Sequence, residues 1–72
     1  MYDRLKAIEA QKNYCKENEI PHFAPYDGRC YRCHKQIYEE IKHDNYSTGI
    51  TVEKAESELV TGCPHCNYSF VD

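Results

Sequence analysis

Two short segments decide the fold of this chain: Cys30-Tyr31-Arg32-Cys33 and Cys63-Pro64-His65-Cys66. They contain four of the five cysteines in a sequence of 72 residues, and 29 residues separate them. Two thiolates three positions apart can bind one cation, because a tight turn carries both sulfurs to the same side of the backbone. Two such turns supply a tetrahedral set of ligands. The sequence therefore predicts one metal site with the ligands Cys30, Cys33, Cys63 and Cys66.

The size of the chain supports this interpretation. In a single domain of 72 residues, the hydrophobic core rarely supplies more than about 3–5 kcal/mol of net stability. A structural Zn²⁺ contributes about 10–16 kcal/mol of apparent binding free energy in small finger peptides. A bound metal ion would therefore determine whether this chain folds.

Disulfide bonds are the alternative means of stabilising so short a chain, and they belong to oxidising compartments. Residues 1–6 are charged and contain no apolar run that would act as a signal peptide or a membrane span. An odd number of cysteines also fits one four-ligand site better than a set of bridges. We therefore expect reduced thiols, a cytoplasmic location and no membrane association.

Two segments are predicted to be helical. Residues 4–18 contain no Gly or Pro, and Asp3 precedes them as an N-cap. Residues 52–59 follow a second N-cap, Thr51, and carry an acidic residue in the first turn. The apolar faces expected to pack on the domain are Leu5, Ile8 and Cys15, flanked by Ala7 and Tyr14, and Val52, Ala55 and Leu59. Cys15 is thus expected to be a small buried side chain rather than a reactive thiol.

Two further segments carry the pattern of β-strands. Residues 35–41 contain β-forming residues, and residues 67–71 alternate in polarity at the end of the chain. The polar residues 43–49 are predicted to form a loop. The side chains expected to face inward from the two strands are Ile37, Ile41, Tyr68 and Phe70.

The residue after each cysteine pair often needs a left-handed backbone, which glycine adopts most easily. Here these residues are His34 and Asn67, and Asn and His are among the residues that tolerate this conformation. Because four cysteines already satisfy a metal ion, we expect the imidazoles of His34 and His65 to face solvent or to donate weakly toward sulfur. Surface positions are expected for His22 and His43.

Two Cys-x-x-Cys turns followed by short strands resemble the zinc-ribbon and rubredoxin-like class of small domains. The resemblance covers residues 26–72, and the helix in residues 1–20 is either part of this domain or appended to it. It implies two opposed knuckles around a closed four-cysteine site, with antiparallel strands beneath and the second helix inserted between the knuckles. The predicted fold class is a small metal-stapled α+β domain.

Four sulfur ligands leave no open position on the ion, which suits one structural Zn²⁺ and argues against hydrolytic catalysis, so no catalytic residue is predicted. Iron is the competitor, because the same tetrahedron can hold Fe and transfer single electrons. Rubredoxins have a similar spacing and a phenylalanine after the second cysteine pair, as Phe70 follows it here. The chain lacks Trp and lacks the glycine after each pair, and we therefore favour zinc.

Seven tyrosines are more than so small a core should bury, and tyrosine is enriched at protein interfaces. We therefore expect a protein-binding module. The basic residues near the first cysteine pair, Arg29, Arg32 and Lys35, are expected to offset the negative charge of a Zn(Cys)4 centre, and contact with nucleic acid is the alternative. Strong nonspecific binding of nucleic acid is disfavoured by the formal net charge of −3.

Overall fold

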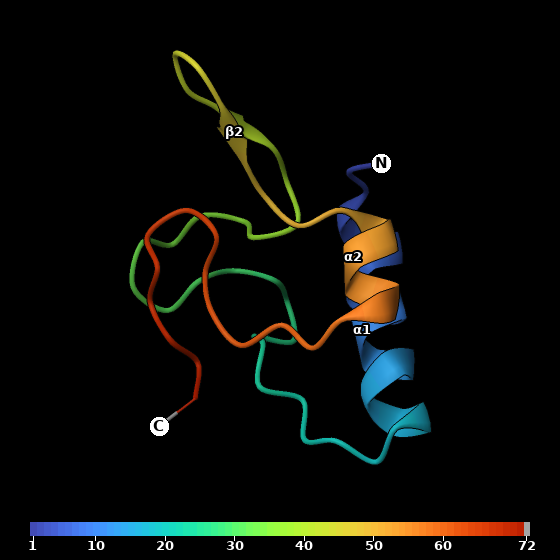
Figure 1. Cartoon of the computed structure of the whole chain (residues 1–72). Coiled ribbons are helices and arrows are strands. Elements are labelled where there is room, and N and C mark those ends of the chain that lie inside the picture. The colour runs from blue at the N-terminus through green and yellow to red at the C-terminus, as the bar shows by residue number, and fades with distance from the viewer. Residues whose placement is uncertain (72) are drawn as a thin grey trace.

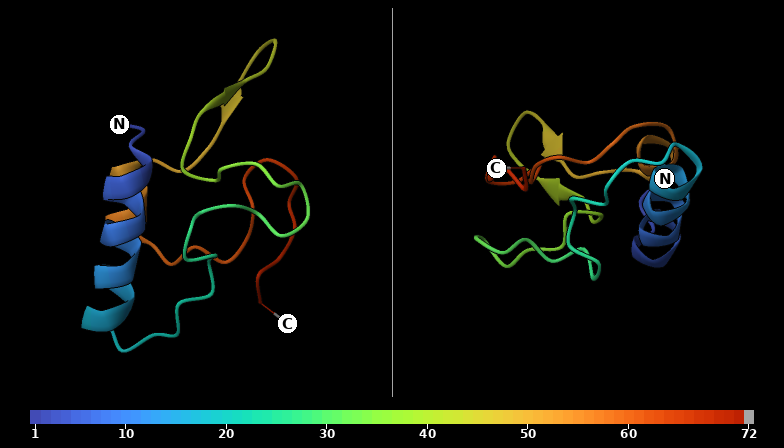
Figure 2. Two further views of the ribbon diagram at one scale, coloured as in Figure 1. Left: turned by 180° about the vertical axis from the view of Figure 1, so that it is seen from behind. Right: turned by 90° about the horizontal axis from the view of Figure 1, so that it is seen from below.

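The computed structural model describes residues 1–71 and shows within them a small α+β fold with two helices, a two-stranded antiparallel sheet and a cluster of cysteines. Asp72, the last residue of the predicted domain, lies outside the described residues. The elements are α1 (Arg4–Glu17), β1 (Ile41–Lys42), β2 (Ser47–Thr48) and α2 (Val52–Ser57). The two helices lie side by side, with the β1–β2 hairpin and the cysteine-bearing loops to one side of them (Figures 1 and 2).

Both predicted N-caps are confirmed. The Asp3 side chain accepts a hydrogen bond from the Lys6 N–H at 3.0 Å, and the Thr51 side chain accepts one from the Lys54 N–H at 3.1 Å. Each bond satisfies one N–H group that has no partner within its helix. α2 ends two residues earlier than predicted, because the backbone at Glu58 is extended.

The buried face of α1 differs from the predicted one. Ala7, Gln11 and Cys15 follow one another at intervals of four and form the buried stripe, with Ile8 partly buried beside them. The burial of Cys15 is as predicted. The prediction for Leu5 was wrong, because this side chain is 70% exposed. Leu5 lies six residues before Gln11, which places it about 120° around the helix from the centre of the buried stripe.

Gln11 joins the two helices with a set of hydrogen bonds. Its side-chain Nε2 donates to the carbonyl oxygens of Ala55 at 2.6 Å and Glu58 at 2.8 Å. Its Oε1 accepts from the backbone N–H of Val60 at 2.7 Å. Although Gln11 is fully buried, both ends of its amide are therefore bonded, and the end of α2 is held against α1.

The strand predicted for residues 35–41 is not formed. Ile37 and Tyr38 are consecutive and both fully buried, whereas successive side chains of a strand point to opposite faces. The chain turns at these two residues, and the first strand begins only at Ile41. The loop predicted for residues 43–49 was also wrong in part, because β2 falls inside it. The pairs in the antiparallel register are Ile41 with Thr48 and Lys42 with Ser47.

The closing strand predicted for residues 67–71 is reduced to one bridge, in which Ser69 pairs with Gly62. Phe70 is partly buried and packs against the core, as predicted. Tyr68 remains exposed, so its predicted inward position was wrong. The core itself consists of Ala7, Ala24, Cys30, Ile37, Tyr38, Ile50, Ala55, Val60 and Cys63. It therefore combines residues of α1 and α2 with one cysteine from each pair.

Replacing Gln11 with Met keeps the length of the side chain but removes its hydrogen bonds. The Val60 N–H and the carbonyl groups of Ala55 and Glu58 would then lose their bonds to this side chain. We expect Gln11→Met to lower the free energy of unfolding by about 3 kcal/mol. The control, Lys12→Met on the exposed side of α1, should change it by less than about 0.5 kcal/mol. Urea denaturation of both variants measures the difference, and equal stabilities would show that the Gln11 bonds do not hold the helices together.

Candidate metal centre

The two cysteine-bearing loops have the same backbone structure. We call residues 29–36 the first cysteine turn and residues 62–69 the second. In each turn, the N–H of the first cysteine donates to a carbonyl five residues later, and its carbonyl accepts from the residue after the second cysteine. In the first turn, the Cys30 N–H donates to Lys35 and the His34 N–H donates to Cys30, and in the second turn Cys63, Tyr68 and Asn67 repeat these bonds. One β-bridge closes each turn, between Arg29 and Gln36 in the first and between Gly62 and Ser69 in the second.

The predicted left-handed residues are confirmed in both turns. His34 has φ 62° and Asn67 has φ 63°. This conformation reverses the chain directly after each cysteine pair and brings the following residues back alongside the residues before it. A residue tolerant of positive φ is therefore needed at the same place in each turn.

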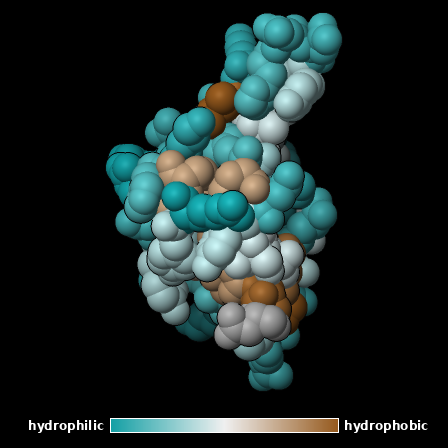
Figure 3. All heavy atoms as spheres, turned by 90° about the vertical axis from the view of Figure 1, so that its left-hand side faces the viewer, coloured by the Kyte–Doolittle hydropathy of each residue, from teal (hydrophilic) through white to brown (hydrophobic). Residues whose placement is uncertain are grey.

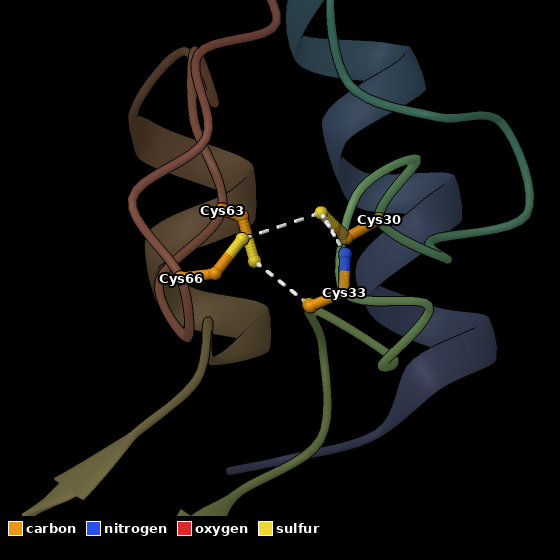
Figure 4. Close-up of side chains that lie close together, drawn as sticks. All are labelled: Cys30, Cys33, Cys63 and Cys66. Carbon is orange, nitrogen blue, oxygen red and sulfur yellow. Dashed lines mark hydrogen bonds between the residues drawn. The ribbon is translucent and has the colours of Figure 1, made fainter.

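The two turns face each other and direct four sulfurs into one space (Figure 4). The Sγ atoms of Cys30 and Cys66 are 3.6 Å apart, those of Cys33 and Cys63 are 3.7 Å apart, and all four lie within 4.8 Å of one another. Sulfurs bound to one tetrahedral zinc ion at about 2.3 Å would be about 3.8 Å apart. The spacing therefore fits four ligands of one ion, and the described cysteines are all free thiols.

Backbone N–H groups donate hydrogen bonds to the sulfur of the first cysteine in each turn. The Sγ of Cys30 accepts from the N–H of Arg32 at 3.3 Å and of Cys33 at 3.5 Å, and the Sγ of Cys63 accepts from the N–H of His65 at 3.4 Å. Cys30 and Cys63 are buried, whereas Cys33 and Cys66 are half-buried. Such donors stabilise negative charge on sulfur, as a thiolate ligand requires.

The pKa values of the two buried thiols are shifted in opposite directions. Burial raises the pKa of Cys30, but N–H groups of Cys33 and Arg32 and the neighbouring thiols outweigh it and lower this pKa to about 7. Burial raises the pKa of Cys63 to about 12, and the adjacent sulfurs of Cys66 and Cys30 add to the rise. A thiolate at one position opposes ionisation of the adjacent thiols, because like charges repel. A bound cation would remove this conflict, because it favours all thiolates at once.

His65 connects the two turns and the hairpin, so its expected contact with solvent or sulfur was wrong. Its Nε2 lies 2.9 Å from the carbonyl oxygen of Gln36, and its Nδ1 lies 2.6 Å from the Thr48 hydroxyl. Because a carbonyl only accepts, Nε2 carries the proton and Nδ1 accepts from Thr48. The Thr48 oxygen in turn accepts from Nε2 of His43 at 3.1 Å. The half-buried imidazole therefore fixes the second turn to the end of the first and to β2.

The other histidines are placed mostly as predicted. His34 and His43 are exposed, and the ring of His43 stacks on Tyr46 at 4.5 Å. The surface position predicted for His22 was wrong. This residue is half-buried, with its ring edge against Tyr26 at 4.8 Å, and burial, with the charge of Lys12, lowers the pKa of its imidazole.

Comparison of the chain with protein-family models, with curated proteins and with solved structures found no match. Within residues 1–71, no helix has both the length and the apolar character needed to cross a membrane. What the geometry defines is a small α+β protein with a four-cysteine cluster suited to a metal ion.

Replacing His65 tests whether the contact between the turns prepares the sulfurs for an ion. His65→Asn is too short to reach both partners, and we expect it to weaken metal binding about 10- to 100-fold. Competition with a chromophoric chelator measures the affinity. His34→Asn is the matched control, since it makes the same change at an exposed residue and keeps a side chain that tolerates positive φ. Equal affinities for the two variants would contradict the assigned role of His65.

Proposed function

We propose that this chain is a zinc-ribbon-like protein in which Cys30, Cys33, Cys63 and Cys66 hold one structural Zn²⁺, and that it acts as a protein-binding module. The convergence of four free thiols at tetrahedral spacing is the observation that carries the proposal. A zinc ion with four sulfur ligands has no position left for water or substrate. The ion would therefore cross-link the two turns rather than catalyse a reaction.

The exposed tyrosines support the binding role. Tyr26, Tyr31 and Tyr46 are each more than 60% exposed, and Tyr2 and Tyr68 also reach the surface. A tyrosine offers a large rigid surface and a hydroxyl, and it loses little conformational entropy on binding. Side chains this exposed contribute little to the core, and tyrosine is enriched at protein interfaces, so these residues favour contact with a partner protein.

Metal analysis separates zinc from iron. Native mass spectrometry of the purified protein should give the mass of one chain with one Zn²⁺, and the solution should be colourless. A red protein with one Fe would instead support a rubredoxin-like electron carrier. A protein that retains neither metal, yet remains folded, would refute the structural metal site.

Two cysteine variants distinguish ligands from the remaining thiol. Cys33→Ser removes one ligand, and we expect it to lose zinc and the dispersed NMR signals of residues 26–71, because the binding free energy of the metal is folding free energy in so small a domain. Cys15→Ala changes a buried thiol of α1 that lies outside the sulfur cluster, and it should keep one equivalent of zinc. Zinc content and a ¹H–¹⁵N spectrum are the measurements. A folded Cys33→Ser protein without metal would contradict the proposal.

Binding of single-stranded nucleic acid is a second candidate, favoured by an aromatic cluster at the cysteine turns. Phe70 makes edge contacts with Tyr31 at 5.8 Å and Tyr68 at 5.9 Å. Hydrophobic residues are exposed on the surface among hydrophilic ones (Figure 3). Exposed aromatic rings can stack on bases. Arg29, Arg32 and Lys35 are all exposed, and the guanidinium of Arg29 donates to the His34 carbonyl at 3.0 Å.

A fluorescent 12-nucleotide dT strand tests this candidate. If the surface binds it, Arg32→Gln with Lys35→Gln should weaken binding about tenfold at low salt, because two phosphate contacts are lost. The control, Lys12→Gln with Lys16→Gln on α1, changes the net charge equally and should have a smaller effect. Fluorescence anisotropy measures both affinities. No binding by the unaltered protein, or equal losses in the two variants, would reject the candidate.

A further inference from the structure

A groove of about 610 Å³ lies between α1 and α2. Its floor is formed by Ala10, Tyr14 and Val52, which are all half-buried, and two of them, Ala10 and Val52, also pack against the core. On α1 the groove lies beside the buried stripe that contains Gln11 and opens to solvent. The two helices therefore present a shallow apolar strip that neither of them covers.

The rim of the groove is acidic, although α1 as a whole is basic. α1 carries four basic residues and two acidic ones, Glu9 and Glu17. Both acidic residues line the groove, together with Glu56 of α2, but Lys6 is the one basic residue of α1 that does. Within residues 1–71, the one ion pair joins the terminal amine to Glu53. The three carboxylates of the rim are therefore free to bind cationic groups of another molecule.

We propose that this groove binds a basic amphipathic helix of a partner protein. The proposal rests on the proposed function as a protein-binding module and names the class of its partner. Both walls are helices, whose backbone groups are bonded internally, so the groove offers no strand edge to an extended peptide. From Lys6 to Glu17, α1 rises about 16 Å, which matches three turns of a docked helix.

The docked helix would place apolar side chains three and four positions apart on the floor of the groove. Lysine or arginine residues on its flanks would meet the carboxylates of Glu9, Glu17 and Glu56. A second copy of this chain would bring a groove of the same negative charge, and like charges would then face each other if the two grooves met.

A pair of synthetic helices tests the proposal. One is a 14-residue peptide with leucines at positions three and four apart and lysines elsewhere, and the other has glutamates in place of the lysines. Added to the zinc-loaded full chain, the lysine peptide should shift the NMR signals of Ala10, Tyr14 and Val52, and the glutamate peptide should not. Shifts confined to another surface, or identical effects of both peptides, would overturn the proposal.

Two variants of equal net charge separate the groove from general attraction to an acidic protein. Glu9→Gln with Glu56→Gln should weaken binding of the lysine peptide about tenfold at low salt. Glu39→Gln with Glu40→Gln, at exposed positions outside the groove, should leave it nearly unchanged. Equal weakening by both pairs would overturn the proposal.

Two further results separate this proposal from the proposed function. A zinc-loaded, folded protein that binds no peptide would refute the groove alone, whereas a folded protein without metal would refute the zinc site. The protein could also form a dimer before any peptide is added, and dilution would then shift the NMR signals of the groove. This result would assign the groove to a second copy of the chain and overturn the proposal of a partner helix.

Discussion

Four thiol groups from two distant turns meet within 4.8 Å of one another, and this convergence sets how the two halves of the loop region are joined. Their sulfurs come from turns that are 29 residues apart at their nearest cysteines, so the cluster closes about half of the chain into one loop. Without a cation, one thiolate opposes ionisation of its neighbours, and the pKa of Cys30 is lowered whereas that of Cys63 is raised. A divalent ion would reverse this, since each added thiolate then increases the attraction.

Around this cluster, hydrogen bonds of polar side chains join segments that a larger protein would join with apolar contacts. Gln11 joins the helices through the backbone at the end of α2, and His65 joins the two cysteine turns to β2. The apolar core is small and includes Cys30 and Cys63. Buried polar side chains with every bond made define one arrangement, but they add little net stability. A metal ion bound by the four cysteines would cross-link the two turns and stabilise the loops.

Features that depend on neighbouring residues were predictable from the sequence, and features that depend on the packing of distant segments were not. The N-caps and the left-handed His34 are set by a few adjacent residues. The clustering of the cysteines was predictable because Cys-x-x-Cys turns have one common geometry. Gln11 was missed because its partners lie more than 40 positions away, and only the fold shows that Ile37 and Tyr38 are both buried. The bonds of His65 were not predicted either, because its partners Thr48 and Gln36 are also distant in the sequence.

X-ray absorption at the zinc edge, measured on the purified full chain, identifies the ligands of the bound ion itself. We expect four sulfur neighbours at about 2.3 Å and no nitrogen or oxygen neighbour. Two sulfurs with nitrogen or oxygen ligands, or a folded protein that contains no metal, would contradict the convergence of Cys30, Cys33, Cys63 and Cys66 on one ion.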